Sequence, residues 1–128
     1  MAKSTRSHTQ HTLKLYRDQG MRCQVVEQWI AWSGTRRDLF GCIDFVALDP
    51  GGRGIVGVQC FGQAFAEHLH KVQGECLDAL LDWLRCGARF DLVGWRKLKV
   101  KRGGKAVRWT PRIQEITLAQ AEAWKELS

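Results

Sequence analysis

Long apolar runs are missing from this sequence of 128 residues. No stretch approaches the roughly 18 consecutive apolar residues that read as a membrane-spanning helix. The N-terminal stretch MAKSTRSHTQ also lacks the apolar core of a secretory signal. The sequence therefore predicts a cytoplasmic protein without a membrane partner.

Disulfide, zinc and common catalytic motifs are missing as well. The five cysteines, at positions 23, 42, 60, 76 and 86, are odd in number, widely spaced and without a CxxC pair. This usage predicts reduced, buried thiols and excludes a disulfide framework or a zinc site. The GGRG segment at 51–54 lacks the Lys-Ser/Thr of a phosphate-binding loop, and no nucleophile elbow or Rossmann glycine pattern is present. We expect structural or solvent-facing roles for the four histidines.

Acidic residues are fewer than basic ones, 13 against 20, which gives a formal charge of +7. Ten of the basic residues fall within positions 85–112, where Asp91 is the one acid before Glu115. Such a cluster favours a polyanionic partner, nucleic acid first, bound through its phosphates with strong salt dependence. No helix-turn-helix, zinc-finger or RNA-recognition pattern is present, which favours contacts to the DNA backbone. The candidate nucleic-acid-binding residues are Arg36, Arg37, Lys97, Lys99, Lys101, Arg102 and Lys105. The alternative is a solvated basic hairpin without a partner.

Hydrophobic periodicity and turn residues predict one α/β domain over residues 1–128, with residues 1–8 disordered. A helix over 9–19, capped by Thr9, precedes strands over 21–32, 42–48 and 54–60, and residues 33–37 form a loop. Helices over 62–72 and 74–86 follow, then strands over 89–98 and 106–116 and a helix over 117–127. The predicted order is αβββααββα.

One carboxylate, Asp44, interrupts the apolar strand CIDFVAL. Burying an unpaired carboxylate costs several kcal/mol unless it is neutralised, paired or bound to a metal. The turn at 49–53 places Asp44 near Val58, with Gly57 and Gln59 as diagonal neighbours. Glu27 is a second carboxylate among apolar residues. In the alternative interpretation, Asp44 lies at a strand end and hydrogen-bonds a loop or an arginine.

Together these features resemble the PD-(D/E)XK nuclease superfamily, most closely its small Holliday-junction-resolvase-like and phage-type endonucleases. The family motif is a Gly-x-x-Asp strand, a short turn and a strand that reads apolar-apolar-Glu-x-Lys. Residues 41–44 (GCID) supply the first part, and the second falls on residues 55–59 (IVGVQ). The resemblance implies a restriction-endonuclease-like fold, with a mixed central sheet flanked by helices. It also implies Mg²⁺-dependent hydrolysis of duplex or branched DNA, including Holliday junctions.

The motif departs from the family at its Glu and Lys positions. In one register Gly57 takes the Glu position and Gln59 the Lys position. In the other, shifted by two residues, Gln59 takes the Glu position and Phe61 the Lys position. The resemblance implies that Asp44 and Glu27 bind Mg²⁺ or Mn²⁺ and that Gln59 positions the attacking water. A carboxylate from another part of the chain could replace the missing family glutamate as a metal ligand. The candidates for such a migrated ligand are Asp38, Glu67 and Glu75.

Two functions remain open at this point. The first is a metal-dependent endonuclease that uses Asp44, Glu27 and Gln59. The second is a nuclease-like fold without chemistry that binds DNA or a protein. The resemblance also implies a possible homodimer, because a four-way junction has two-fold symmetry, and Trp29, Trp32 or Trp124 could form its interface.

Overall fold

The computed structural model describes residues 7–128, so residues 1–6 of the segment predicted to be disordered lie outside it. For residues 7 and 8 that prediction is wrong, because helix α1 (His8–Asp18) begins there. Ser7 is its N-cap, and its side-chain oxygen accepts the Gln10 N–H at 3.1 Å. Serine satisfies a free helix N–H in this way. Thr9, the predicted cap, lies inside the helix.

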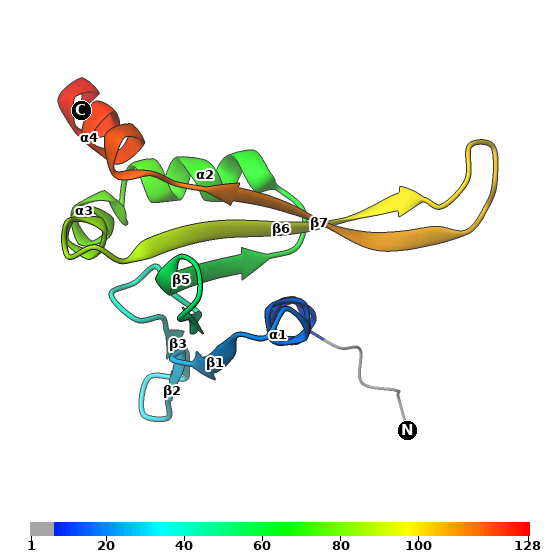
Figure 1. Cartoon of the computed structure of the whole chain (residues 1–128), viewed down its shortest axis with the longest axis horizontal. Helices are drawn as coiled ribbons and strands as arrows, with labels where there is room; N and C mark the ends of the chain where they lie inside the picture. The colour runs from blue at the N-terminus through cyan, green and yellow to red at the C-terminus, as the bar shows by residue number, and fades with distance from the viewer. Residues whose placement is uncertain (1–6) are drawn as a thin grey trace.

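A five-stranded mixed sheet forms the centre of the protein, in the order β1-β4-β5-β6-β7 (Figure 1). Strands β5 and β6 are parallel, and every other neighbouring pair is antiparallel. A parallel pair needs a crossover connection, which α2 (Phe65–Gln73) and α3 (Leu77–Arg85) provide. The strands are β1 (Arg22–Val25), β4 (Phe45–Asp49), β5 (Gly54–Phe61), β6 (Arg89–Lys99) and β7 (Val107–Glu115). The predicted α/β class with a mixed central sheet is therefore confirmed.

The two faces of the sheet bury separate apolar cores. One core joins Tyr16 of α1 to Phe45 and Val58 of the sheet. The other joins α3 and α4 (Leu118–Leu127) to the opposite face and contains a stripe of four leucines at helical spacing: Leu77, Leu80, Leu81 and Leu84. Burial of each such leucine contributes about 2 kcal/mol. Within residues 7–128, no helix is both long and apolar enough to cross a membrane.

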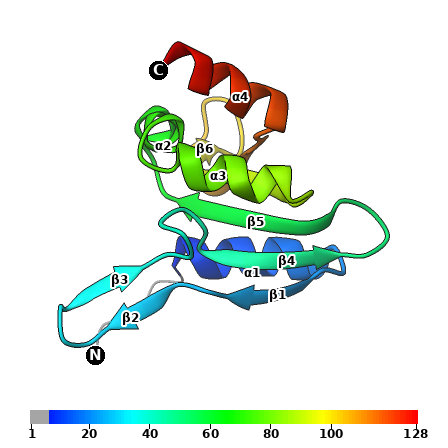
Figure 2. The same cartoon turned by 90° about the vertical axis from the view of Figure 1, so that its left-hand side faces the viewer.

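The single strand predicted over residues 21–32 is wrong, and so is the loop predicted over 33–37. The chain forms β1, breaks, and then forms a hairpin of β2 (Gln28–Ile30) and β3 (Thr35–Arg37). At the break, the N–H groups of Val26 and Glu27 both donate to the Asp44 carbonyl, at 3.0 and 3.2 Å. Two residues opposite one are typical of a β-bulge, which bends its strand. The hairpin consequently projects from the body of the protein (Figure 2).

An ion pair joins the turn after β4 to the beginning of β6. The Arg53 guanidinium binds both carboxylate oxygens of Asp91, at 2.6 and 2.7 Å. Asp91 is 1% exposed, and its carboxylate also accepts the Tyr16 hydroxyl. Burial, together with the Asp91 charge, raises the pKa of Tyr16 well above its ordinary value. Tyr16 therefore stays a neutral hydrogen-bond donor to Asp91.

Strands β6 and β7 continue beyond the rest of the sheet as a two-stranded arm (Figure 1). The arm places Lys97 opposite Trp109 and Lys99 opposite Val107. Because side chains alternate along a strand, Lys97 and Lys99, two residues apart in β6, lie on the same side of the arm. Pro111 lies in β7, an edge strand of the sheet, where a proline is tolerated because its missing N–H can face away from the neighbouring strand.

Candidate metal centre

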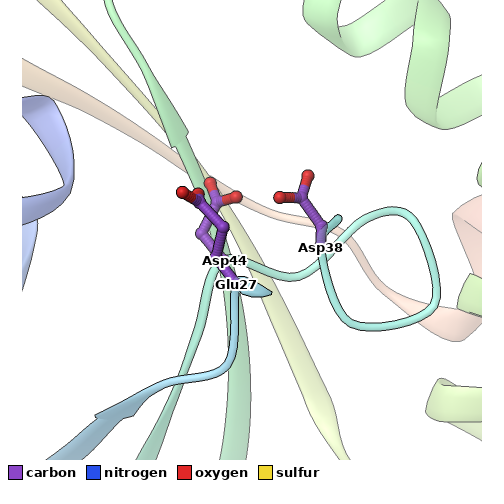
Figure 3. Close-up of side chains that lie close together, drawn as sticks. All are labelled: Glu27, Asp38 and Asp44. Atoms are coloured by element: carbon purple, nitrogen blue, oxygen red, sulfur yellow. The ribbon is translucent and has the colours of Figure 1, made fainter. Parts of the chain in front are cut away.

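Three carboxylates meet where the β2–β3 hairpin leaves the sheet (Figure 3). Glu27 directly precedes β2, Asp38 directly follows β3, and Asp44 directly precedes β4. One carboxylate oxygen from each residue lies within 4.8 Å of the other two. The structure therefore brings together Asp44 and Glu27, the two predicted metal ligands, and adds Asp38. Glu67 and Glu75, the other possible migrated ligands, are not part of this cluster.

Asp44 is the most buried member of the cluster, at 6% exposed. Its N–H donates to the Val58 carbonyl at 2.8 Å, and its Oδ2 accepts the Cys60 N–H at 2.8 Å. Phe45 is the direct partner of Val58, so Asp44 lies one residue from it, near Val58 as the sequence predicts. Asp44 thus lies at a strand end, but its partner is the backbone of β5 and neither a loop nor an arginine.

Burial raises the pKa of Asp44 from its ordinary 3.8 to about 7. Removal from water disfavours the charged carboxylate. The Cys60 N–H opposes this shift, whereas the neighbouring charges of Asp38 and Glu27 add to it. A carboxylate cluster of this kind is an unfavourable arrangement without a cation, because its members repel one another at close range.

The raised pKa predicts that the metal-free protein becomes less stable as the pH rises from about 4 to about 7. In this range folded Asp44 keeps a proton that the unfolded chain has released, so the free energy of unfolding falls with pH. Asp44→Asn keeps an oxygen for the Cys60 N–H but cannot ionise. In urea unfolding with EDTA, we expect the variant to be about 1–4 kcal/mol more stable than the wild type at pH 8, with a much smaller difference at pH 4. A difference that does not change with pH would contradict this environment for Asp44.

Glu27 is held by an arginine of the hairpin. Its Oε1 lies 2.8 Å from Arg36 Nη1, and the Glu27 side chain is 18% exposed against 72% for Arg36. Arg36 and Arg37 are successive residues of β3, with Trp29 opposite Arg36 and Gln28 opposite Arg37. Strand alternation therefore places the two arginines on opposite faces of the hairpin. Arg36 alone of the two is ion-paired with the carboxylate cluster.

Gln59 lies in β5 between the two residues that hydrogen-bond Asp44. It is 4% exposed, and within the described chain its Oε1 atom is buried without a hydrogen-bond partner. Buried polar atoms normally have partners, so this orphaned amide oxygen, on the strand whose backbone holds Asp44, is informative. An amide oxygen can coordinate a hard cation, and it can accept a hydrogen bond from a water bound to that cation.

Gly57 has no room for the glutamate of the family motif. A Cβ atom there would lie 2.8 Å from Ile43 Cδ1 and 3.0 Å from the Trp83 ring. A carboxylate at this position would therefore displace the core between β5 and α3.

The donor set fits a hard divalent cation. Three carboxylates supply only oxygen atoms, which Mg²⁺ and Mn²⁺ prefer over nitrogen or sulfur. The described cysteines are all free thiols, and the cluster includes none of them. The three carboxylates could thus hold the Mg²⁺ or Mn²⁺ that the resemblance implies.

A basic surface continues from the end of β5 along the arm. The five predicted contacts in the arm and its turn are all exposed: Lys97, Lys99, Lys101, Arg102 and Lys105. A pocket of about 330 Å³ at the base of the arm is lined by Arg96, Lys97 and Arg112, and the Arg112 guanidinium lies 4.0 Å from the centre of the Phe65 ring. Gly62, the residue directly after β5, also lines this pocket. The base of the arm therefore lies beside the end of β5, where Phe61 pairs with Gly94.

Comparisons of the chain with protein-family models, with curated proteins and with solved structures give no match.

Proposed function

We propose that this protein is a metal-dependent endonuclease of the PD-(D/E)XK type that hydrolyses phosphodiester bonds in DNA. The observation that carries the proposal is the convergence of Glu27, Asp38 and Asp44, whose carboxylate oxygens lie within 4.8 Å of one another around the buried Asp44. The mixed sheet, the helices on both of its faces and the basic arm support it. Duplex and branched DNA, including four-way junctions, are the proposed substrates.

Each residue has a separate task in this proposal. Glu27, Asp38 and Asp44 hold Mg²⁺ or Mn²⁺, and the Cys60 N–H keeps the Asp44 carboxylate in place. The bound cation supplies Lewis-acid polarisation of the phosphate and a water of lowered pKa. Gln59 orients that water through its amide oxygen. The arm holds the DNA backbone through its lysines and arginines.

A second function has one specific observation in its favour. The two registers of the family motif fall on positions 57, 59 and 61, and this chain has Gly57, Gln59 and Phe61 there. The motif lysine is therefore missing in both registers. A nuclease fold without this lysine could serve as a DNA-binding or protein-interaction module. Its DNA binding would be salt-dependent, would not need Mg²⁺ and would survive Asp44→Ala.

Cleavage assays distinguish the two functions. Purified protein is incubated with duplex, single-stranded and four-way-junction DNA in Mg²⁺, Mn²⁺ or EDTA. We expect cleavage of at least one substrate in Mg²⁺ or Mn²⁺ and none in EDTA. Binding of DNA without cleavage under every condition would support the second function and contradict the first.

The arm can be tested through the salt dependence of DNA binding. Lys101→Ala combined with Arg102→Ala should reduce the slope of log K against log salt by roughly one to two, because each lost phosphate contact removes about one released counterion. Fluorescence anisotropy with a labelled duplex measures this slope. Arg85→Ala with Lys125→Ala, on α3 and α4, removes the same charge from another surface and should leave the slope unchanged. An unchanged slope in the arm variant would remove Lys101 and Arg102 from the interface.

A further inference from the structure

The β2–β3 hairpin carries two of the three cluster carboxylates at its two feet. Glu27 is the residue before β2 and Asp38 is the residue after β3 (Figures 2 and 3). The two strands pair with each other and with no other strand in the described chain, and all of their residues except Ile30 are exposed. An isolated two-stranded hairpin is only marginally stable in water. The spacing of Glu27 and Asp38 therefore depends on how well this hairpin is ordered.

The hairpin also presents an aromatic and basic surface. Trp29 is 59% exposed and Trp32, in the turn, is 89% exposed. Trp29 is opposite Arg36, so both lie on one face of the hairpin, and Arg36 reaches from this face to Glu27. Exposed aromatic rings stack on unpaired bases, and arginines contact the adjoining phosphates. The chemistry of this face therefore fits a single-stranded segment of DNA that leads toward the carboxylate cluster.

We propose that the β2–β3 hairpin is a DNA-binding arm that couples the binding of an unpaired strand to metal affinity at the cluster. A phosphate on Arg36 releases Glu27 from its ion pair, and Glu27 then binds the cation. A base stacked on Trp29 orders the hairpin and fixes Asp38. Because coupling between two ligands is reciprocal, the cation in turn strengthens DNA binding at the hairpin.

Metal binding without catalysis tests the coupling. The free Mn²⁺ signal in electron paramagnetic resonance gives the dissociation constant of Mn²⁺, with and without a single-stranded oligonucleotide whose phosphorothioate linkages resist cleavage. Mn²⁺ bound by the oligonucleotide alone is subtracted. We expect the constant to fall about fivefold or more when the oligonucleotide is bound. An unchanged constant, with binding of the oligonucleotide verified by anisotropy, would overturn the proposal.

Three hairpin variants locate the effect. Without DNA, Arg36→Gln should bind Mn²⁺ more tightly than the wild type, because Glu27 is no longer ion-paired. Adding the oligonucleotide should then increase its Mn²⁺ affinity much less than it does for the wild type. Trp29→Ala should keep the wild-type Mn²⁺ affinity without DNA. The oligonucleotide should increase that affinity less than it does in the wild type. Arg37→Gln removes the same charge from the other face and should behave as the wild type. An equal loss of coupling in the Arg36 and Arg37 variants would contradict a face-specific contact.

The coupling rests on the proposed metal-dependent function, and the same titrations separate their failures. Saturable Mn²⁺ binding that DNA does not change refutes the hairpin's role and leaves the metal site in place. A wild-type protein that binds no Mn²⁺ refutes both. Sedimentation of Trp29→Ala examines the remaining alternative: a change of oligomeric state with an unaltered DNA effect would assign this face to a second copy of the chain and overturn the proposal.

Discussion

Asp44→Ala is expected to abolish metal-dependent DNA cleavage while the protein stays folded. Asp44 is the most buried carboxylate of the cluster, and the Cys60 N–H fixes its orientation. Loss of partners that merely orient metal ligands lowers affinity or activity by about 10–100-fold, so loss of a ligand should exceed about 100-fold. Removal of a carboxylate with a raised pKa also relieves an unfavourable burial, so the fold should tolerate the change.

The matched control for this variant is Asp82→Ala. Asp82 is an exposed aspartate of α3 outside the cluster, so its removal changes the net charge equally without touching the site. Cleavage rates of the two variants and the wild type, with circular dichroism to verify folding, decide the question. Cleavage at the wild-type rate by folded Asp44→Ala would remove Asp44 from the mechanism.

Arg53→Ala is expected to lower the free energy of unfolding by about 3–5 kcal/mol. The substitution leaves Asp91, which is 1% exposed, as a buried charge with only the Tyr16 hydroxyl as a side-chain partner. It also removes the contact of Arg53 with Glu115 at 3.4 Å. A domain of this size has a total stability of about 5–15 kcal/mol, so the loss is a large fraction of the whole.

Urea unfolding of three variants measures this effect. Asp91→Asn combined with Arg53→Ala should recover part of the loss, because the uncompensated charge disappears. Lys14→Ala breaks an exposed pair with Asp18 and should cost no more than about 0.5 kcal/mol. A cost below about 1 kcal/mol for Arg53→Ala would mean that water or another group compensates Asp91.

The sequence predicts those parts of the fold that depend on local patterns. The leucine stripe of α3 has helical spacing, and the Pro-Gly turn between β4 and β5 has turn chemistry, so both are correct from sequence alone. The break between β1 and β2 could not be predicted, because it depends on a bulge in which Val26 and Glu27 share the Asp44 carbonyl. That contact joins segments that no local periodicity relates.

The candidate site was predicted in part, for the same physical reason. Asp44 is conspicuous in the sequence, because a carboxylate in an apolar strand needs a partner or a cation. The apolar surroundings of Glu27 similarly marked it as a candidate. Asp38 follows a short, exposed strand and was one of three possible migrated ligands, and only the closing of the β2–β3 hairpin places it beside the others. The Arg53–Asp91 ion pair could not be predicted from the sequence, because its two residues lie in separate elements that no local pattern relates.

The most direct test of the metal site is isothermal titration calorimetry of the wild type and Asp44→Ala with Mg²⁺ and Mn²⁺, in the absence of DNA. We predict one saturable site per chain in the wild type for at least one of the two cations, and its loss in the variant. Equal binding by both proteins, or no binding by the wild type, would contradict the assignment of Glu27, Asp38 and Asp44 as a metal centre.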